Sequence, residues 1–366
     1  MATYSSIKSF KKEYNEQLPV EGVPVGSVSY IDGEFYIWDG IEWGKINTVI
    51  PPVPTSGTIY TSPGEYTWVA PEGVTSVSVV AVGGGGGGGH RGTHITNGSG
   101  GQGGCGAGLG WKNNIPVVPG QSYTVVVGAG GIGGSKSITD PGGDSYFIST
   151  STVAGLGGPR GKDGDDADVQ VVTPGGLYVG DGGGQGGSGG IGQSSVSSGV
   201  NQGGGGGGAG GYTGAGGAGG AADNPNVSTA GYIGTGGGGG GGSSATSITG
   251  GYRIGAGGGG GVGIFGQGDS GAGGALPTSG STGTTFGGKG GSGGTDSEDN
   301  TYTGAYGPGS VGGLYGGGGG GPGLAFNGVD GASGAVRIIW GSDRLFPTTN
   351  TADSATLTAG SSENII

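Results

Sequence analysis

The sequence predicts an all-β protein in which a small β-sandwich carries an extended bundle of polyglycine II helices. The first observation is that 110 of the 366 residues are glycine. The second is that short segments of alternating apolar residues flank the glycine-rich stretches. Five runs of consecutive glycines stand out, at 83–89, 203–208, 236–242, 257–261 and 316–321. Collagen is excluded, because the strict Gly-X-Y period is missing and proline numbers only 17.

The glycine runs need a source of order that is not side-chain burial. Ordering the backbone of one residue costs about 1–2 kcal/mol, and glycine loses the most freedom. A flexible coil is one solution and stays open as an alternative. The other is an extended helix with three residues per turn, whose bare backbones approach closely enough to hydrogen-bond to one another. We therefore predict a prism of antiparallel helices over residues 203–321, with loops at both ends.

The N-terminal residues 1–46 are predicted to form an attachment or oligomerisation module. Four apolar residues are spaced three, four and four apart, as on one face of a short helix that Pro19 ends. They are Ile7, Phe10, Tyr14 and Leu18. A helix this short is marginal alone, so we expect this face to pack on a partner subunit or on the chain's own core, and predict a homotrimer.

A three-stranded β-module follows from Val25. Apolar residues alternate on both sides of Asp32–Gly33, which is a strong hairpin signal, and a second turn at Asp39–Gly40 precedes Trp43. A module of this size can just close a core and gains stability from association. Residues 47–57, stiffened by three prolines, are predicted to be a linker.

The sandwich is predicted between residues 58 and 341. Strands are expected at 66–69 and 74–82, in the stretches that begin at Gln121 and Asp144, and from Gly334, where Ile338 and Trp340 face the same way. Because these strands bracket the glycine-rich stretches, we predict a sandwich with a long glycine-rich insertion, whose core is 203–321. Residues 342–366 are left as a C-terminal tail.

Composition excludes several functional classes. The formal net charge is −12 with only 13 lysines and arginines, so no basic patch is available for nucleic acid or an anionic membrane. Cys105 is the sole cysteine, so no intrachain disulfide can form. Without an apolar leader or a run of about 18 apolar residues, we expect a soluble protein made in the cytoplasm and not inserted in a membrane.

Three motifs resemble binding sites but are better explained otherwise. Residues 283–290 match a phosphate-binding loop up to Lys289, yet Gly290 stands where Ser or Thr must bind magnesium, and no strand precedes the motif. His90, His94 and Cys105 offer zinc ligands, but the two histidines lie in a glycine loop where no helix aligns them.

The third motif is the acidic segment from Asp163 to Asp168. It suits a hard cation, although the EF-hand pattern fails, and a solvated acidic loop is the favoured interpretation. Whether an ion binds there is left open. No Ser-His-Asp triad and no nucleophile elbow are found. We expect no catalytic residue, no metal and no cofactor, and hence no enzyme.

Aromatic residues beside polar groups, the usual composition of a recognition surface, lie between the glycine runs. The receptor-binding candidates are Tyr252, Arg253, Phe265, Phe286, Tyr302 and Tyr306. Packing at the ends of the glycine prism is the equally weighted alternative.

Four sequence segments carry a resemblance to a known group of proteins. They are "VAPEGVTSVSVVAVGGGGGG", "PGQSYTVVVGAGGIGG", "GGDSYFIS" and "GASGAVRIIWGSDRLFPTTN". Together they resemble the glycine-rich domain of bacteriophage tail-fibre and adhesin-type proteins, especially from phages of cyanobacteria, over Gly57 to Asn350. The segment "GSVSYIDGEFYIWDGIEWGKI" resembles small hairpin repeats near the N-termini of virion fibre proteins.

The resemblance implies a non-enzymatic virion fibre or adhesin component whose loops, held on a polyglycine scaffold, contact the host surface. Its partners would be other tail, neck or fibre proteins and a host receptor, and its location the virion. A purely structural neck or tail decoration fibre and a host-surface polysaccharide depolymerase remain alternatives. Residues 155–321 follow no motif that aligns with the family, so no host-contact residue is implied.

Overall fold

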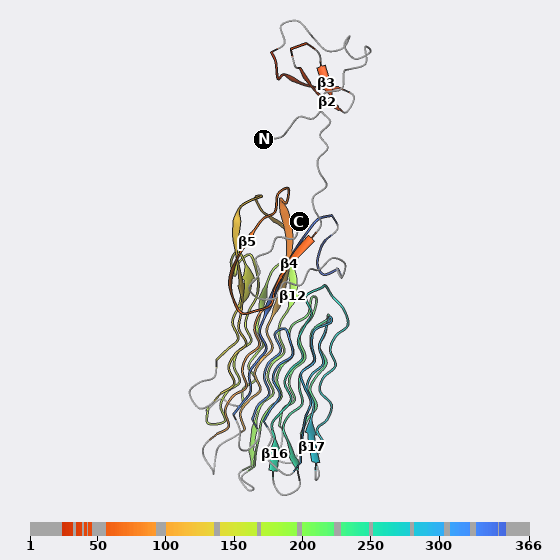
Figure 1. The fold of residues 1–366 in the computed structure, drawn as a ribbon. Coiled ribbons are helices and arrows are strands. Elements are labelled where there is room, and N and C mark those ends of the chain that lie inside the picture. The colour runs from red at the N-terminus through yellow and green to blue at the C-terminus, as the bar shows by residue number, and fades with distance from the viewer. Residues whose placement is uncertain are drawn as a thin grey trace. The chain divides into compact units, whose positions relative to one another are not determined.

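The computed structural model describes residues 24–31, 34–38, 40–41, 43–45, 56–92, 100–134, 140–166, 170–195, 200–222, 228–248, 252–278, 282–303, 308–322, 327–342 and 344–348. The chain divides into two compact units, Met1–Pro52 and Val53–Ile366, which are treated separately below (Figure 1). The boundary at Pro52 falls within the predicted linker, residues 47–57.

The first unit contains the three predicted strands. They are β1 (Val28–Ile31), β2 (Glu34–Trp38) and β3 (Trp43–Lys45), in the antiparallel order β1-β2-β3. Ile31 pairs with Glu34 across the first turn, and Trp38 pairs with Trp43 across the second. The side chains of Tyr36 and Trp38 are buried. Ile7, Phe10, Tyr14 and Leu18, the predicted oligomerisation face, lie outside the described residues.

The second unit begins with a sandwich of two antiparallel sheets. One has the order β11-β10-β9-β8-β5 and the other β12-β7-β6-β19-β4. Their strands are β4 (Ser56–Tyr60), β5 (Gly64–Val69), β6 (Ser76–Val82), β7 (Leu109–Pro116), β8 (Ser122–Val127), β9 (Ser145–Phe147), β10 (Val153–Gly155), β11 (Tyr178–Val179), β12 (Gly182–Gly184) and β19 (Ala335–Trp340).

Alternation along the central strands divides the apolar side chains between two clusters. Val79 and Ile338 belong to the core between the sheets, where the ring centroid of Trp68 lies 5.7 Å from both Phe147 and Trp340. Val80 and Ile339 point the other way, into a second cluster that includes residues of the glycine-rich part. The expectation that Ile338 and Trp340 share a face is confirmed, because both lie in the first cluster.

Five of the ten sandwich strands were not predicted, namely β4, β7, β10, β11 and β12, of which the last three have only two or three residues each. Strand β7 carries Lys112, Asn113 and Asn114, whose polar side chains hide the strand pattern, and Asn114 adopts a positive φ of 53°. Strand β4 begins at Ser56, inside the stretch assigned to the linker, and pairs with β19 from Ser56↔Trp340 to Tyr60↔Val336. The sheet therefore begins at Ser56 and includes the last two residues of the linker that the prolines predicted.

The glycine-rich segments form extended helices with a repeat of three residues. In helix 203–211, the N–H groups of Gly204, Gly205 and Gly206 donate to carbonyls of three different segments, at residues 101, 220 and 257. The next three repeat the order and donate to residues 104, 217 and 260, over N to O distances of 2.9–3.0 Å. This period is that of the polyglycine II helix. The predicted polyglycine II bundle is thus present in the fold.

The bundle is assembled from several excursions of the sandwich chain rather than from one insertion. Residues 83–108, 128–144, 156–177 and 185–334 each leave the sandwich after one strand and return to the next (Figure 1). The last excursion contains the predicted core at 203–321. The helices of separate excursions lie side by side, as where Gly84 donates to Gly143 O and Gly85 to Ala332 O.

Glycine is required at the positions where a Cβ would meet the backbone of a neighbouring helix. A Cβ built on Gly206 would lie 2.2 Å from the carbonyl oxygen of Gly318, and one on Gly219 would lie 1.9 Å from that of Gly205. The positions that face solvent carry side chains instead. In helix 215–222 these are Ala215, Ala218 and Ala221, every third residue.

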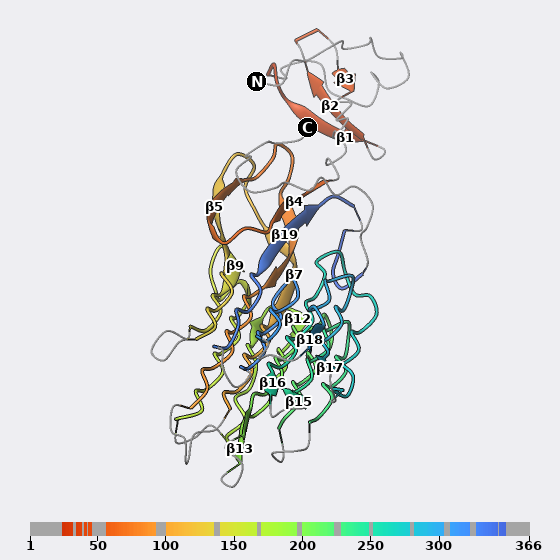
Figure 2. The same ribbon diagram turned by 60° about the horizontal axis from the view of Figure 1, so that its bottom comes forward.

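At the end of the bundle away from the sandwich, the helices are joined by three hairpins (Figures 1 and 2). They pair β13 (Gln193–Ser195) with β14 (Val200–Gln202), β15 (Thr246–Ile248) with β16 (Tyr252–Ile254), and β17 (Thr282–Thr285) with β18 (Asn300–Thr303). In the part of the chain that the structure describes, no helix has the length and apolar character needed to cross a membrane.

Candidate recognition surface and polar networks

The three hairpins form the candidate recognition surface. Each one ends a pair of polyglycine II helices whose backbone bonds fix its place, as where Ala245, just before β15, donates to Gly203 O over 2.9 Å. Strands β15 and β16 both lie against β17. A hydroxyl pair links β17 and β18, with Thr284 Oγ1 2.9 Å from Thr301 Oγ1. A rigid scaffold that positions surface loops is a common design for binding sites.

The structure brings some of the receptor-binding candidates together at this surface. Tyr252 and Arg253 belong to β16, where Arg253 is paired with Ser247 and Tyr252 with Ile248. Tyr302 belongs to β18 and is paired with Gly283. These residues are therefore on neighbouring hairpins at one end of the bundle. Tyr306 lies outside the described residues.

Phe286 directly follows β17, at the point where the strand becomes a helix. Its side chain is half-buried. Its N–H donates to Ser243 Oγ over 2.8 Å, and its carbonyl accepts from the N–H of Ser243 over 2.9 Å. These bonds tie the base of the β17–β18 hairpin to the neighbouring helix 238–245.

Phe265 lies at the other end of the bundle, where the helices meet the sandwich. It packs against the second apolar cluster, which contains Ile339 of β19. The guanidinium carbon of Arg337 lies 4.5 Å from the centroid of its ring. The structure thus separates Phe265 from the hairpin candidates and gives it packing contacts at the junction.

The same junction holds two buried polar side chains that sequence patterns did not reveal. Arg337 of β19 is 1% exposed, and its Nη1 donates to Ile264 O over 3.2 Å. Burial and the nearby Arg344 lower the pKa of Arg337 to about 10, so it stays charged at neutral pH. Tyr212 is fully buried, its hydroxyl donates to Gly263 O, and burial raises its pKa. In the sequence, Arg337 is the one charged residue of an apolar strand, and Tyr212 is an aromatic residue that follows a glycine-rich run.

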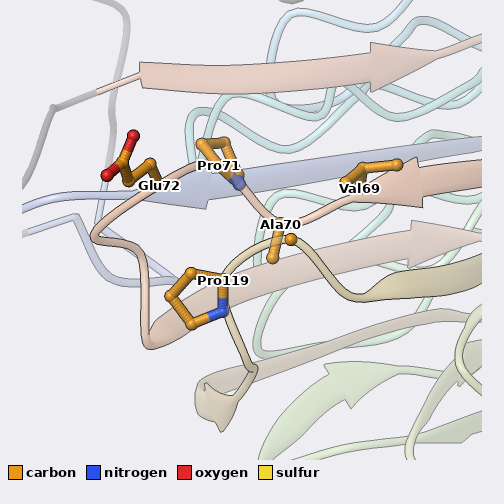
Figure 3. A pocket seen from close by; sticks show the side chains of 6 residues that line it. Val69, Ala70, Pro71, Glu72 and Pro119 are labelled. Carbon is orange, nitrogen blue, oxygen red and sulfur yellow. The ribbon is translucent and has the colours of Figure 1, made fainter. Parts of the chain in front are cut away.

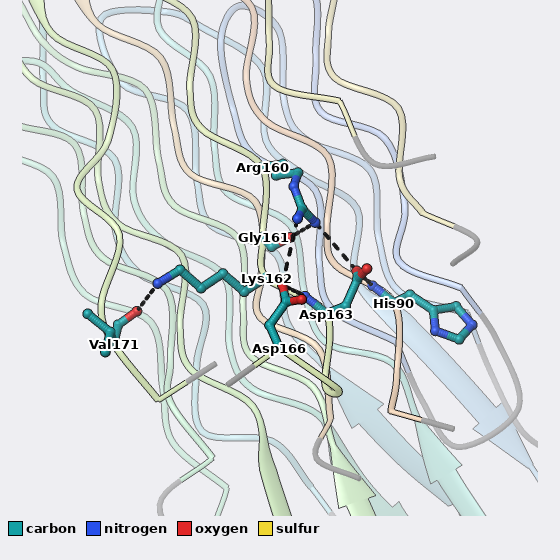
Figure 4. A network of polar contacts seen from close by, with 7 residues as sticks. All are labelled: His90, Arg160, Gly161, Lys162, Asp163, Asp166 and Val171. Atoms are coloured by element: carbon teal, nitrogen blue, oxygen red, sulfur yellow. Dashed lines mark hydrogen bonds and ion pairs between the residues drawn. The ribbon is translucent and has the colours of Figure 1, made fainter. Parts of the chain in front are cut away.

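The acidic segment that begins at Asp163 forms a local polar network (Figure 4). Asp163 Oδ1 accepts from the backbone N–H of His90 over 2.7 Å, and Asp166 Oδ2 accepts from the N–H of Asp163 over 3.0 Å. The guanidinium of Arg160 lies 3.6 Å from both carboxylates. Among the described residues no group of three or more His, Cys, Asp and Glu could hold a metal ion. Asp168 and His94 lie outside the described residues.

Cys105 is buried inside the bundle, away from solvent. Its Sγ donates to Thr173 O over 3.2 Å and accepts from Gly189 N over 3.4 Å. Burial raises its pKa to about 11. Gln102, three residues earlier, likewise donates through Nε2 to Val171 O over 2.9 Å. These two side chains link helix 100–108 to the stretch 171–173 of the neighbouring segment.

The motif that resembles a phosphate-binding loop has its backbone donors already engaged. The N–H of Gly288 donates to Gly258 O, and that of Lys289 to Ala272 O. The Lys289 ammonium lies 3.3 Å from Asp296 Oδ2. This segment is therefore part of the polyglycine II bundle.

One hollow lies on the sandwich, between the turn after β5 and the turn before β8 (Figure 3). It is lined by Val69, Ala70, Pro71, Glu72, Pro119 and Gly120. Glu72 is the single ionisable lining residue, so the hollow offers little polar chemistry for a ligand.

Comparison with known families gives one match. The profile of the glycine-rich domain family matches residues 61–295, more than half of the chain. The match includes strands β5 to β12 and most of the bundle. No curated protein matches the sequence.

Proposed function

The chain belongs to the glycine-rich domain family, and from this premise we propose that it is a non-enzymatic component of a bacteriophage virion fibre or adhesin. In this proposal the bundle is a rigid scaffold, and the three hairpins at its far end recognise the host surface. The placement of β16 and β18, which carry Tyr252, Arg253 and Tyr302, on adjacent hairpins is the observation that supports this assignment. The sequence resemblance to phage fibre proteins supports the virion location.

The proposal also includes assembly with other proteins. The first unit, with the apolar residues Ile7, Phe10, Tyr14 and Leu18, would attach the chain to other tail, neck or fibre proteins and form a homotrimer. Light scattering of the full chain tests the trimer, since a stable monomer would contradict it. Deletion of residues 1–47 should weaken assembly while leaving the bundle folded.

Host recognition is tested with tyrosine variants of the full chain. Labelled protein would be incubated with a panel of cyanobacterial strains, and bound label measured by flow cytometry. We expect Tyr252→Ala and Tyr302→Ala to reduce binding to the strain that binds wild type, with little change in melting temperature. Tyr232→Ala is the matched control, because Tyr232 is 65% exposed on the side of the bundle and belongs to no hairpin.

Three outcomes would contradict the proposal in different ways. If wild type binds no strain but labels purified virions through their necks or tails, the chain is a decoration fibre without receptor binding. A rise in reducing ends after incubation with host polysaccharide would instead identify a depolymerase. If all three tyrosine variants bind equally well, Tyr252 and Tyr302 of the hairpins do not contribute to host recognition.

A further inference from the structure

The edges of the polyglycine bundle contain a recurrent feature in which an aspartate takes the place of a missing neighbour. In helix 286–291, Gly288 and Gly291 donate to the carbonyls of Gly258 and Gly261, as elsewhere in the lattice. Gly287 and Gly290 do not follow this pattern. Their N–H groups donate to Asp299 Oδ1 over 3.1 Å and to Asp296 Oδ1 over 2.8 Å.

The spacing shows that the carboxylates substitute for a helix. Gly287 and Gly290 are three residues apart and so lie on one side of their helix, as Asp296 and Asp299 do on theirs. The carboxylate oxygens accept the bonds that backbone carbonyls accept on the other sides. An amide N–H with an ionised acceptor makes a stronger hydrogen bond than with a neutral one.

The same arrangement recurs at two other edges. The N–H of Gly133 in helix 128–134 donates to Asp330 Oδ1 over 2.7 Å, while Gly131 and Gly134 donate to backbone carbonyls. The N–H of Gly157 in helix 156–166 donates to Asp144 Oδ1 over 2.8 Å. Asp144, Asp296, Asp299 and Asp330 are all exposed.

The outermost helices of the bundle resemble the edge strand of a β-sheet, because both have backbone groups without a neighbouring segment to pair with. Unpaired backbone N–H and C=O groups in a row can pair with another chain, and natural sheets protect such edges with charges and side chains. A second copy of this chain is the partner that fits, because its own bundle has the matching three-residue repeat. A carboxylate that already holds the edge amide removes the donor such a copy would need.

We propose that Asp144, Asp296, Asp299 and Asp330 are lattice caps, which end the polyglycine bundle and prevent two copies of the chain from joining through their bundles. The effect comes from occupation of the edge amides by an acceptor. Negative charge alone would not produce it. The inference does not rest on host recognition, because none of the four aspartates belongs to a strand of a hairpin.

Two quadruple variants separate acceptor from charge. In one, all four aspartates become alanine, which removes both. In the other they become asparagine, which removes the charge and keeps an amide oxygen as acceptor. Sedimentation velocity over a range of protein concentrations, at one ionic strength, measures association beyond the wild-type oligomer.

We expect the alanine variant to associate, with its mean mass at high concentration rising about twofold or more, as pairing of two copies requires. The asparagine variant should stay at the wild-type mass. If both variants associate equally, charge repulsion rather than capping limits association, and the proposal is wrong. It is equally wrong if the alanine variant stays at the wild-type mass.

A local measurement remains decisive if the quadruple alanine variant does not fold. Single variants Asp296→Ala and Asp296→Asn would be compared by amide hydrogen exchange of Gly290. Exchange should accelerate in the alanine variant and stay near the wild-type rate in the asparagine variant. Equal rates in wild type and Asp296→Ala would mean that the carboxylate does not hold this amide.

Discussion

A hydrogen atom is the only side chain that fits at position 239. A Cβ there would lie 2.2 Å from the carbonyl oxygen of Gly260 and 2.6 Å from its carbon. The obstacle is the backbone of a helix that is itself bonded on another side, since the carbonyl of Gly260 accepts from the N–H of Ala209 in helix 203–211 over 3.0 Å. Neither helix can move aside without breaking further hydrogen bonds.

We therefore predict that Gly239→Ala lowers the free energy of unfolding by about 3 kcal/mol or more, well above the usual effect of a surface substitution. The matched control is Gly268→Ala, where the nearest atom to the new Cβ is Ser292 Cα at 3.2 Å. This change should cost less than about 1 kcal/mol. Calorimetric melting measures both, and equal melting temperatures would show that the bundle tolerates side chains between its helices.

Cys105 gives a second residue-scale prediction. Burial raises its pKa from 9.0 to about 11, so at pH 8 the thiolate population is about a hundredfold smaller than for an exposed thiol. We expect alkylation by iodoacetamide to be slow in the native protein and fast in denaturant. Because Cys105 is the sole cysteine, mass spectrometry reads its modification directly. Rapid native alkylation would place the thiol at the surface.

The same shift has a consequence for stability. The folded protein keeps its proton on the thiol above pH 9, where the unfolded chain releases it. The contribution of Cys105 to stability is therefore complete below about pH 9 and is lost as the pH rises toward 11.

At the scale of elements, the glycine pattern distinguishes interior helices from surface helices. Helix 203–211 is almost pure glycine and helix 238–245 begins with five consecutive glycines, and each is surrounded by other helices. Helix 215–222, at the surface, has alanine at every third position. A helix with three residues per turn presents three rows of positions, and a position in such a row is glycine where a Cβ would meet the backbone of a neighbouring helix.

This relation explains which parts of the fold were predictable. The five glycine runs predicted an ordered bundle, and alternation predicted the strand that ends at Trp340. The aspartate caps were not predictable, since Asp296 and Gly290 come together only once two helices lie antiparallel. The contact between Phe265 and Arg337 was not predictable for a related reason, because residues 265 and 337 are far apart in sequence and meet only where the bundle joins the sandwich.

The segment after β19 packs at the junction between the sandwich and the bundle. Phe346 N–H donates to Asn113 Oδ1 over 2.9 Å, and Asn113 Nδ2 donates to Phe346 O over 2.7 Å. The Phe346 ring stacks on Tyr212 with centroids 5.9 Å apart. This residue thus connects strand β7 with a turn of the bundle.

We predict that Phe346→Ala lowers the free energy of unfolding by about 3–5 kcal/mol, because the ring is 2% exposed and its removal leaves a cavity. Leu345→Ala is the control, since Leu345 is 40% exposed, and should change stability by less than about 1 kcal/mol. Urea denaturation followed by tryptophan fluorescence measures both. A small effect of Phe346→Ala would mean that the junction does not depend on this segment.

At the scale of the second unit, sandwich and bundle are continuous. Strand β6 runs directly into helix 83–91, and helix 327–334 runs directly into β19. Most hydrogen bonds of the bundle join residues far apart in sequence, as between Gly85 and Ala332. A helix that forms alone gains none of these bonds, so the bundle has to form together with the excursions that build it.

This continuity predicts that the sandwich and the bundle unfold as one cooperative structure. Amide hydrogen exchange measured at increasing denaturant should give Val79 of the sandwich and Gly207 of the bundle the same opening free energy, because neither can open while the other stays intact. Gly207 donates to Gly104 O over 2.9 Å and accepts from Gly318 N over 2.9 Å, so its exchange reports three helices at once. Exchange of residues 203–321 at random-coil rates would mean that the bundle is not ordered in solution. If Gly207 instead opens at a distinctly lower free energy than Val79, the bundle is a separate folding unit attached to a stable sandwich, and the hairpins lose the rigidity that the proposed recognition requires.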